Sequence, residues 1–146
     1  MGIVYFYRES EKPFGCFSNF SPHNFSLDGQ SWYTVEHYFQ AQKFPGHRQA
    51  DRIRESRSPM EAKRLGGDRN LPLRADWNSV KDDIMRKAVR AKFGAHDNIR
   101  AVLLRTGDNR LVENARNDPY WGIGEDGTGK NMLGRILMEI HAELVR

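Results

Sequence analysis

The sequence predicts a helix-rich α+β fold, with one domain over residues 1–146 and a small antiparallel sheet. Several segments carry apolar residues at helical spacing between N-cap and stop residues, and one Asp-Gly pair lies between two short extended runs. Helices and strands do not alternate regularly, which argues against a doubly wound parallel sheet. No linker or internal repeat divides the chain, and its length is enough for one hydrophobic core.

The strands are predicted from β-branched and aromatic runs. IVYFY at residues 3–7 is typical of a strand. Asp28-Gly29 predicts a hairpin turn within residues 23–33, because both residue types tolerate the positive φ angles of such turns. RLVENA at residues 110–115 predicts one further short strand.

The helices are predicted from their ends and their periodicity. The segment 34–44 is mostly apolar or aromatic and stops before a Pro-Gly pair, and residues 48–55 form a second short helix. The third runs from an N-cap at Ser58, through Glu61 of a capping box, to a stop at Gly66.

Three more helices are expected in the second half. Ser79 is predicted to cap a long helix that ends at Phe93, Asp97 a helix through Leu104, and the last helix covers residues 132–145. The expected core faces are Val80, Ile84, Ala88 and Ala91 of the long helix and Leu133, Ile136, Leu137, Ile140 and Leu144 of the last.

Composition and motifs exclude several classes of protein. The net charge of +4 permits a phosphate-bearing ligand, but the basic residues form no arm that would follow a nucleic-acid backbone. No apolar run approaches a membrane span, and the first ten residues lack the features of a secretory signal. Cys16 is the one cysteine, so no internal disulfide is expected. We therefore expect a cytoplasmic protein without membrane association.

No metal or cofactor is expected. The five histidines show no HExxH or similar ligand spacing. The glycine-rich loop WGIGEDGTGKN lacks the GxxxxGK[ST] spacing of a phosphate-binding loop.

Three polar residues lie in line on the otherwise apolar helix 34–44. At about 100° per residue, Glu36, Gln40 and Lys43 fall within a stripe of roughly 60°. The stripe is either a thin solvated face held together by helical neighbours, or the wall of a pocket.

Aromatic residues in predicted loops have a similar double interpretation. Trp77, Trp121 with its neighbour Tyr120, and Phe20 with its neighbour Asn19 lie in loop segments. A large ring in a loop needs a core slot or a ligand to cover it. Several such loops in one small domain favour a pocket with stacking walls for a flat heterocycle.

Six motifs together resemble the NADAR superfamily, in particular its stand-alone bacterial riboflavin-biosynthesis-intermediate N-glycosidases. They are GCFSNFSP, VEHYFQAQKF, SPMEAKRLG, LRADWNSVKDDIMRKAVRAKF, LVENARNDPYWGIG and GKNMLGRILMEI, and they cover nearly the whole chain in order. The resemblance implies a helix-rich α+β fold, no metal, and hydrolysis of the C–N bond between ribose and a base-like heterocycle. It also implies a catalytic group of Glu36, Trp77 and Asp118.

We expect Glu36 to stabilise the positive charge that develops on the ribose and to act as a base for water. Trp77 would stack on the heterocycle, and Asp118 would bind ribose hydroxyls or protonate the departing nitrogen. Lys43 would keep Glu36 ionised, pair with a phosphate, or attack C1′ of a ring-opened ribose. The other expected substrate-binding residues are Asn19, Phe20, Gln40, Tyr120, Trp121 and Gly122, with Arg8, Lys12, Lys43 and Arg69 as candidates for the phosphate.

The substrate has three interpretations. The first is a small phosphoribosylamino-pyrimidine intermediate of riboflavin biosynthesis. The second is ADP-ribose attached to guanine in DNA or RNA, which would make ADP-ribosylated nucleic acid a partner. The third is a non-catalytic module that binds ADP-ribose-like ligands. The oligomeric state is not predicted.

Overall fold

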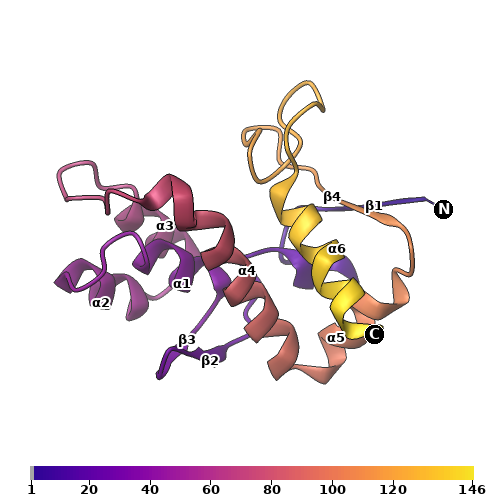
Figure 1. The fold of residues 1–146 in the computed structure, drawn as a ribbon, viewed down its shortest axis with the longest axis horizontal. Coiled ribbons are helices and arrows are strands. Elements are labelled where there is room, and N and C mark those ends of the chain that lie inside the picture. The colour runs from indigo at the N-terminus through magenta and orange to yellow at the C-terminus, as the bar shows by residue number, and fades with distance from the viewer. Residues whose placement is uncertain (1) are drawn as a thin grey trace. The chain divides into compact units, whose positions relative to one another are not determined.

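The computed structural model describes residues 2–146, which form two compact units (Figure 1). One unit comprises residues 22–95, and the other comprises the residues before and after that segment. Among the described residues, none of the helices has the length and apolar character needed to cross a bilayer.

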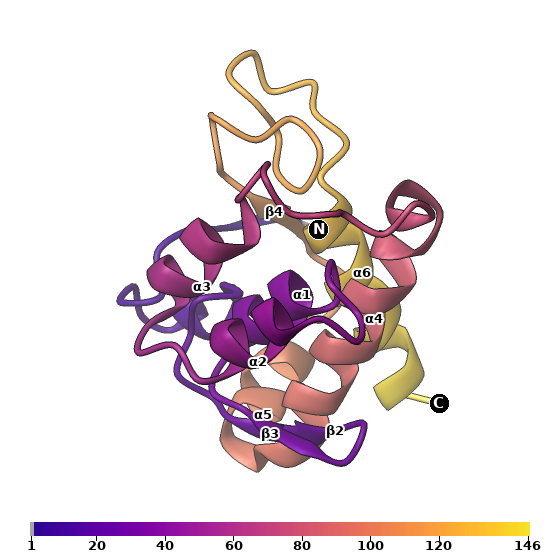
Figure 2. The ribbon, with the colours of Figure 1, turned by 90° about the vertical axis from the view of Figure 1, so that its left-hand side faces the viewer.

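The unit of residues 22–95 is built around one short central helix. Its elements are β2 (Phe25–Leu27), β3 (Gln30–Trp32), α1 (Val35–Ala41), α2 (Arg48–Arg54), α3 (Pro59–Gly66) and α4 (Trp77–Ala95). Helix α1 contacts β3 and all three other helices of the unit, and Figure 2 shows it among them. All seven residues of α1 are buried.

The predicted hairpin is confirmed and is tied to two helices. Strands β2 and β3 are antiparallel, and Asp28 and Gly29 have φ angles of 54° and 77° at the turn. The Tyr38 hydroxyl of α1 donates to one carboxylate oxygen of Asp28 at 2.6 Å, and Lys87 of α4 donates to the other at 2.9 Å. These two hydrogen bonds lower the pKa of Asp28, because both favour the charged carboxylate.

Helix α1 begins where the sequence predicts and ends earlier. The Thr34 hydroxyl accepts a hydrogen bond from the His37 backbone N–H, as an N-cap does. The backbone N–H groups of Lys43 and Phe44 bond to carbonyls three residues back, so the chain tightens after Ala41 rather than continuing as an α-helix.

Two predicted capping residues prove to lie inside their helices. Helix α4 begins at Trp77, two residues before Ser79, because the carbonyl of Asp76 accepts the first bonds from Ser79 and Val80. Asp97 is the first residue of α5 rather than its cap, and its carboxylate pairs with Arg100.

Helix α3 has the predicted cap but not the full capping box. Ser58 accepts from the backbone N–H of Glu61, whereas the Glu61 carboxylate pairs with Arg64. Gly66 is the last residue of the helix, which Gly67 terminates.

The buried face of α4 differs from the predicted one. Val80, Ile84 and Ala91 are partly exposed, and of the predicted positions only Ala88 is fully buried. The residues that α4 buries are Trp77, Met85, Ala88, Val89, Lys92 and Phe93.

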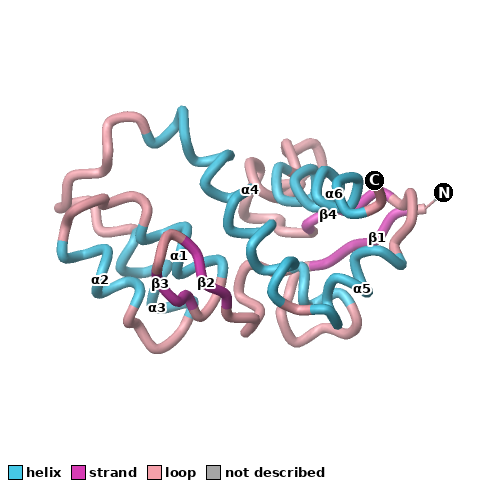
Figure 3. The backbone as a smooth tube through the Cα atoms, turned by 60° about the horizontal axis from the view of Figure 1, so that its bottom comes forward, coloured by secondary structure: helices cyan, strands magenta, loops and turns pink. Residues whose placement is uncertain are grey.

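The other unit contains the second pair of strands. Its elements are β1 (Ile3–Phe6), the 3₁₀ helix η1 (Phe14–Phe17), α5 (Asp97–Arg105), β4 (Arg110–Glu113) and α6 (Met132–Leu144). Strands β1 and β4 pair in parallel, whereas β2 and β3 form the antiparallel hairpin, and Figure 3 shows both pairs. A parallel pair requires a long connection, and most of the chain lies between β1 and β4.

Helix α6 confirms most of its predicted core face. Leu133, Ile136, Leu137 and Ile140 are at most 2% exposed, whereas Leu144 is 36% exposed at the end of the helix. The α+β, helix-rich class is therefore confirmed, with a parallel strand pair beside the expected antiparallel one.

The His37 side chain makes folding stability depend on pH. Its Nε2 lies 3.1 Å from the Ser56 carbonyl and its Nδ1 lies 2.8 Å from the Thr34 hydroxyl, an arrangement that suits the neutral ring with the proton on Nε2. Burial lowers the pKa of His37, and the bond to Ser56 partly opposes this.

As pH falls below about 6.5, the unfolded chain therefore binds a proton at His37 before the folded chain does. We expect the free energy of unfolding to fall more steeply between pH 7.5 and pH 5 in the wild type than in H37Q, by denaturant titration. H141Q, which replaces an intermediate-exposure histidine of α6, is the matched control. An equal slope in H37Q would contradict the assignment.

Candidate functional site

The polar stripe of α1 is not a solvated face. Glu36 is 7% exposed and Gln40 is 6% exposed. The Gln40 side-chain Nε2 donates to Glu36 Oε2 at 2.7 Å. A buried carboxylate needs hydrogen-bond donors, and helical spacing places this donor one turn along the same helix.

Lys43 adds a partly buried amine to the same group. Its Nζ lies 3.4 Å from the Gly66 carbonyl at the end of α3 and 5.7 Å from the centre of the Trp77 ring. Burial lowers the pKa of Lys43, the charge of Glu36 opposes this, and the charge of Lys63 lowers it further. The cluster therefore joins a carboxylate and an amide of α1 with an amine of lowered pKa just after the end of that helix.

Trp77 is positioned by packing at the start of α4. It is 8% exposed, and its ring meets the Phe39 ring edge-on at a centroid distance of 5.0 Å. The ring therefore packs in the core against Phe39, with the Lys43 amine near its face, and the pocket-wall interpretation stays a prediction.

Arg74, which sequence reasoning missed, brings Trp77 to Lys43. Its backbone N–H bonds to the Lys43 carbonyl at 3.0 Å, and its guanidinium bonds to the Gln42 carbonyl at 3.3 Å. Asp76 holds the same guanidinium at 2.7 Å. The Arg-x-Asp spacing just before a helix could have indicated the ion pair of Arg74 with Asp76. The two carbonyls that Arg74 binds are distant in sequence, so no local pattern indicates them.

Asp118 organises a loop of the other unit. Its Oδ1 accepts from the backbone N–H groups of Tyr120 at 3.0 Å and Trp121 at 2.9 Å. The rings of these two residues meet edge-on at 5.0 Å, and the amine of Lys130 lies 5.3 Å from the Tyr120 ring centre. Asp118 therefore stabilises the conformation of this loop, in addition to any chemical role.

Gly122 and Asn131 fix the two ends of this glycine-rich loop. A Cβ on Gly122 would lie 2.8 Å from the Ala115 Cβ and 2.9 Å from the Glu113 carbonyl, so only glycine fits. Asn131, with φ 52°, accepts from the Glu113 N–H and donates to the Leu111 carbonyl, both at 2.9 Å. Sequence reasoning missed Asn131, although Asn readily adopts this backbone conformation before a helix.

The remaining predicted residues are less tightly placed. Asn19 and Phe20 follow η1 and are half-buried, and the Oδ1 of Asn19 is a buried acceptor without a partner among the described residues. The three basic candidates for the phosphate are exposed and make no ion pair within residues 2–146; they are Arg8, Lys12 and Arg69.

The structure therefore brings the predicted residues together in two groups. Glu36, Gln40, Lys43 and Trp77 form one group in the unit of residues 22–95. Asp118, Tyr120, Trp121 and Gly122 form the other, in the loop before α6.

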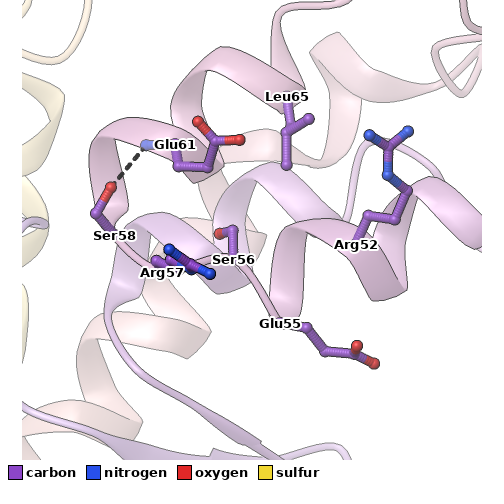
Figure 4. Close-up of a pocket in the computed structure, with 7 residues that line it drawn as sticks. All are labelled: Arg52, Glu55, Ser56, Arg57, Ser58, Glu61 and Leu65. Atoms are coloured by element: carbon purple, nitrogen blue, oxygen red, sulfur yellow. Dashed lines mark hydrogen bonds between the residues drawn. The ribbon is translucent and has the colours of Figure 1, made fainter.

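Two pockets of the unit of residues 22–95 lie apart from Glu36 and Trp77. A pocket of about 680 Å³ lies between α2 and α3, and Figure 4 shows Arg52 and Arg57 in it together with Glu55 and Glu61. A second pocket, of about 570 Å³, is lined by residues of β3, α2 and the end of α1. Opposite charges balance in the first pocket, so it has no strong preference for an anion.

Metal ligation finds no support in the described part of the chain. Within residues 2–146, no three His, Cys, Asp or Glu side chains lie close enough together to hold a metal ion. The chemistry available to the Glu36 group is that of a carboxylate, an amide, an amine and an indole.

Comparison with known proteins identifies the family. Residues 5–145 match the NADAR domain. The chain belongs to the NADAR domain family. This one match covers nearly the whole chain, so it spans both compact units.

Several known proteins are similar over nearly the full chain. "N-glycosidase YbiA" of Escherichia coli K12 is 51% identical over 142 residues, which cover 97% of this chain and 88% of that protein. The NMR structure of Escherichia coli YbiA superposes with a TM-score of 0.91 at 50% identity, covering 99% of this chain and 85% of that one. "Riboflavin biosynthesis protein PYRR, chloroplastic" of Zea mays is 40% identical over 158 residues, covering 98% of this chain and 25% of that protein.

In this NADAR domain the charges near Lys43 act in opposite directions on its amine. Replacing Glu36 with Gln removes a negative charge, so the pKa of Lys43 should fall further. Replacing Lys63 with Met removes a positive charge, so the pKa of Lys43 should rise. NMR titration of isotope-labelled lysine side chains would measure both. Shifts in the same direction in the two variants would contradict the described cluster.

Proposed function

We propose that this chain is an N-glycosidase that hydrolyses the C–N bond between ribose and the heterocycle of phosphoribosylamino-pyrimidine intermediates of riboflavin biosynthesis. The products are ribose 5-phosphate and a diaminopyrimidine. The observation that carries the proposal is the buried Glu36 carboxylate, held by Gln40 on α1, with Lys43 just beyond the end of that helix and next to Trp77. The names of the Escherichia coli and Zea mays relatives support the reaction and the substrate class.

Glu36 supplies the charge that this reaction needs. Breaking an N-glycosidic bond places positive charge on C1′ and the ring oxygen of the ribose, so an adjacent carboxylate stabilises the transition state. The same carboxylate takes a proton from the attacking water. The Gln40 amide fixes its orientation before the substrate binds.

The other residues bind and orient the substrate. Trp77 stacks on the heterocycle, and the Asp118 side chain binds ribose hydroxyls or protonates the leaving nitrogen. Lys43 pairs with the phosphate, and its amine is already partly buried without the substrate. Its lowered pKa also raises the share of neutral amine, on which attack at C1′ of a ring-opened ribose depends.

The outer parts of the substrate meet residues that are more exposed. The proposal also includes Asn19, Phe20, Tyr120 and Trp121 as substrate-binding residues. The exposed cations Arg8, Lys12 and Arg69 are further candidates for the 5′-phosphate.

One experiment tests the substrate. Purified protein is incubated separately with a phosphoribosylamino-pyrimidine and with an oligonucleotide that carries ADP-ribosylated guanine. Release of ribose 5-phosphate from the first supports the proposal. Release of ADP-ribose from the second substrate alone would indicate that the enzyme acts on ADP-ribosylated guanine in nucleic acid instead. Release from neither, by folded protein, would leave a ligand-binding module.

Glu36→Gln should lower kcat by about 10²–10⁴-fold, because the amide neither carries charge nor accepts the proton. The Gln40 bond survives in this variant, since the new amide still offers an oxygen, so the melting temperature should change little. Glu55→Gln, an exposed carboxylate on the same unit, is the matched control. Wild-type rates in Glu36→Gln would remove Glu36 from the chemistry.

Trp77→Ala should raise KM by roughly 5–150-fold, corresponding to a stacking contribution of about 1–3 kcal/mol. Trp77→Phe keeps an aromatic face and should lose much less. Steady-state kinetics and thermal unfolding of both variants separate the two roles of this ring. Loss of folding in Trp77→Ala without a KM effect in a milder variant would assign the residue to the core.

A further inference from the structure

Gly66 closes the cluster of polar residues around Glu36 from the side of α3. It is the last residue of that helix, and its carbonyl accepts the bond from the Lys43 amine. A Cβ on Gly66 would lie 2.7 Å from Cδ and 2.8 Å from Cβ of Gln40, and closer still to Gln40 Oε1. The Gln40 amide therefore occupies the space that a side chain at position 66 would need.

Neither the backbone nor the helix explains a glycine at this position. Gly66 does not have a positive φ angle, so its backbone conformation is open to alanine. Alanine is also a much better helix residue than glycine. The neighbouring Gly67 has room for a side chain, because the atoms nearest to a Cβ there would be 3.6 Å away. What requires glycine at position 66 is the contact with Gln40.

Gln40 in turn is held in a position that only Glu36 explains. Its Nε2 donates to the Glu36 carboxylate, while its Oε1 is buried against Gly66 and has no hydrogen-bond partner among residues 2–146. Turning the amide over would place its oxygen against the carboxylate oxygen and lose the bond. An orphaned buried acceptor is unfavourable, so the arrangement is retained for the carboxylate rather than for packing.

We propose that Gly66 is a positioning residue for Glu36 and acts through the amide of Gln40. A side chain at position 66 would push the Gln40 amide away and leave the carboxylate without this donor. The inference rests on the proposed function, in which Glu36 carries the chemistry.

The test is a double-mutant cycle of Gly66→Ala and Gln40→Ala, with Gly67→Ala as matched control. Each protein is assayed for ribose 5-phosphate release from a phosphoribosylamino-pyrimidine and for its melting temperature. Gly66→Ala should lower kcat by about 10–100-fold with little change in KM, because a displaced catalytic group mainly affects the chemical step. Gln40→Ala should lower kcat similarly, and Gly67→Ala should match the wild type.

The cycle isolates the path through Gln40. In the Gln40→Ala background the amide is gone, so adding Gly66→Ala should lower kcat by less than about threefold. If Gly66→Ala lowers kcat by the same factor in both backgrounds, position 66 acts independently of Gln40 and the proposal is overturned. If Gly66→Ala fails to fold, Gln40→Ala decides: a folded Gln40→Ala with wild-type kcat overturns it as well.

A second measurement needs no substrate. Carbon-detected NMR titration follows the Glu36 carboxylate, which should protonate at higher pH in Gly66→Ala and Gln40→Ala, because each removes a hydrogen-bond donor from the charged form. Gly67→Ala should leave the midpoint unchanged. An unchanged midpoint in Gly66→Ala overturns the proposal.

The two proposals fail in different ways. Full activity in Glu36→Gln removes the proposed catalytic role itself. An inactive Glu36→Gln together with a fully active Gly66→Ala leaves that role intact and removes only the positioning by Gly66.

Discussion

The hydrogen bond from Gln40 to Glu36 constrains how the helices of the unit of residues 22–95 pack. Both residues lie on α1, a helix buried along its whole length, where a carboxylate is unfavourable unless a donor meets it. The donor comes from one turn along the same helix, and its amide then requires a glycine where α3 approaches. A local polar contact thereby sets how closely two helices pack, and the same approach brings a carbonyl of α3 to Lys43.

Polar side chains that bind backbone hold the loops on which the proposed function depends. Arg74 joins the segment before α4 to the end of α1, and Asn131 joins the glycine-rich loop to β4. Asp118 shapes the turn that carries two aromatic residues. Loops alone place side chains loosely, whereas these bonds give loop residues the definition that a reacting site needs.

Local signals in the sequence predicted some turns and helix caps correctly and others not. The hairpin at Asp28 and the cap at Ser58 involve atoms a few residues apart, and both are confirmed. Ser79 and Asp97 are not caps. The first hydrogen bonds of α4 go to the backbone carbonyl of Asp76, and Asp97 is itself the first residue of α5. The parallel pairing of β1 with β4 joins strands from opposite ends of the chain, and no short-range pattern specifies it.

The sequence by itself determined the helix-rich α+β class, the family resemblance, and the alignment of Glu36, Gln40 and Lys43 on one side of a helix. Periodicity decides alignment, because it depends only on the geometry of one helix. Tertiary structure decided whether that line faces water, because burial depends on segments that are distant in sequence. Only the folded chain placed Trp77 next to Lys43 and Gly66 against Gln40, through contacts that no spacing in the sequence encodes.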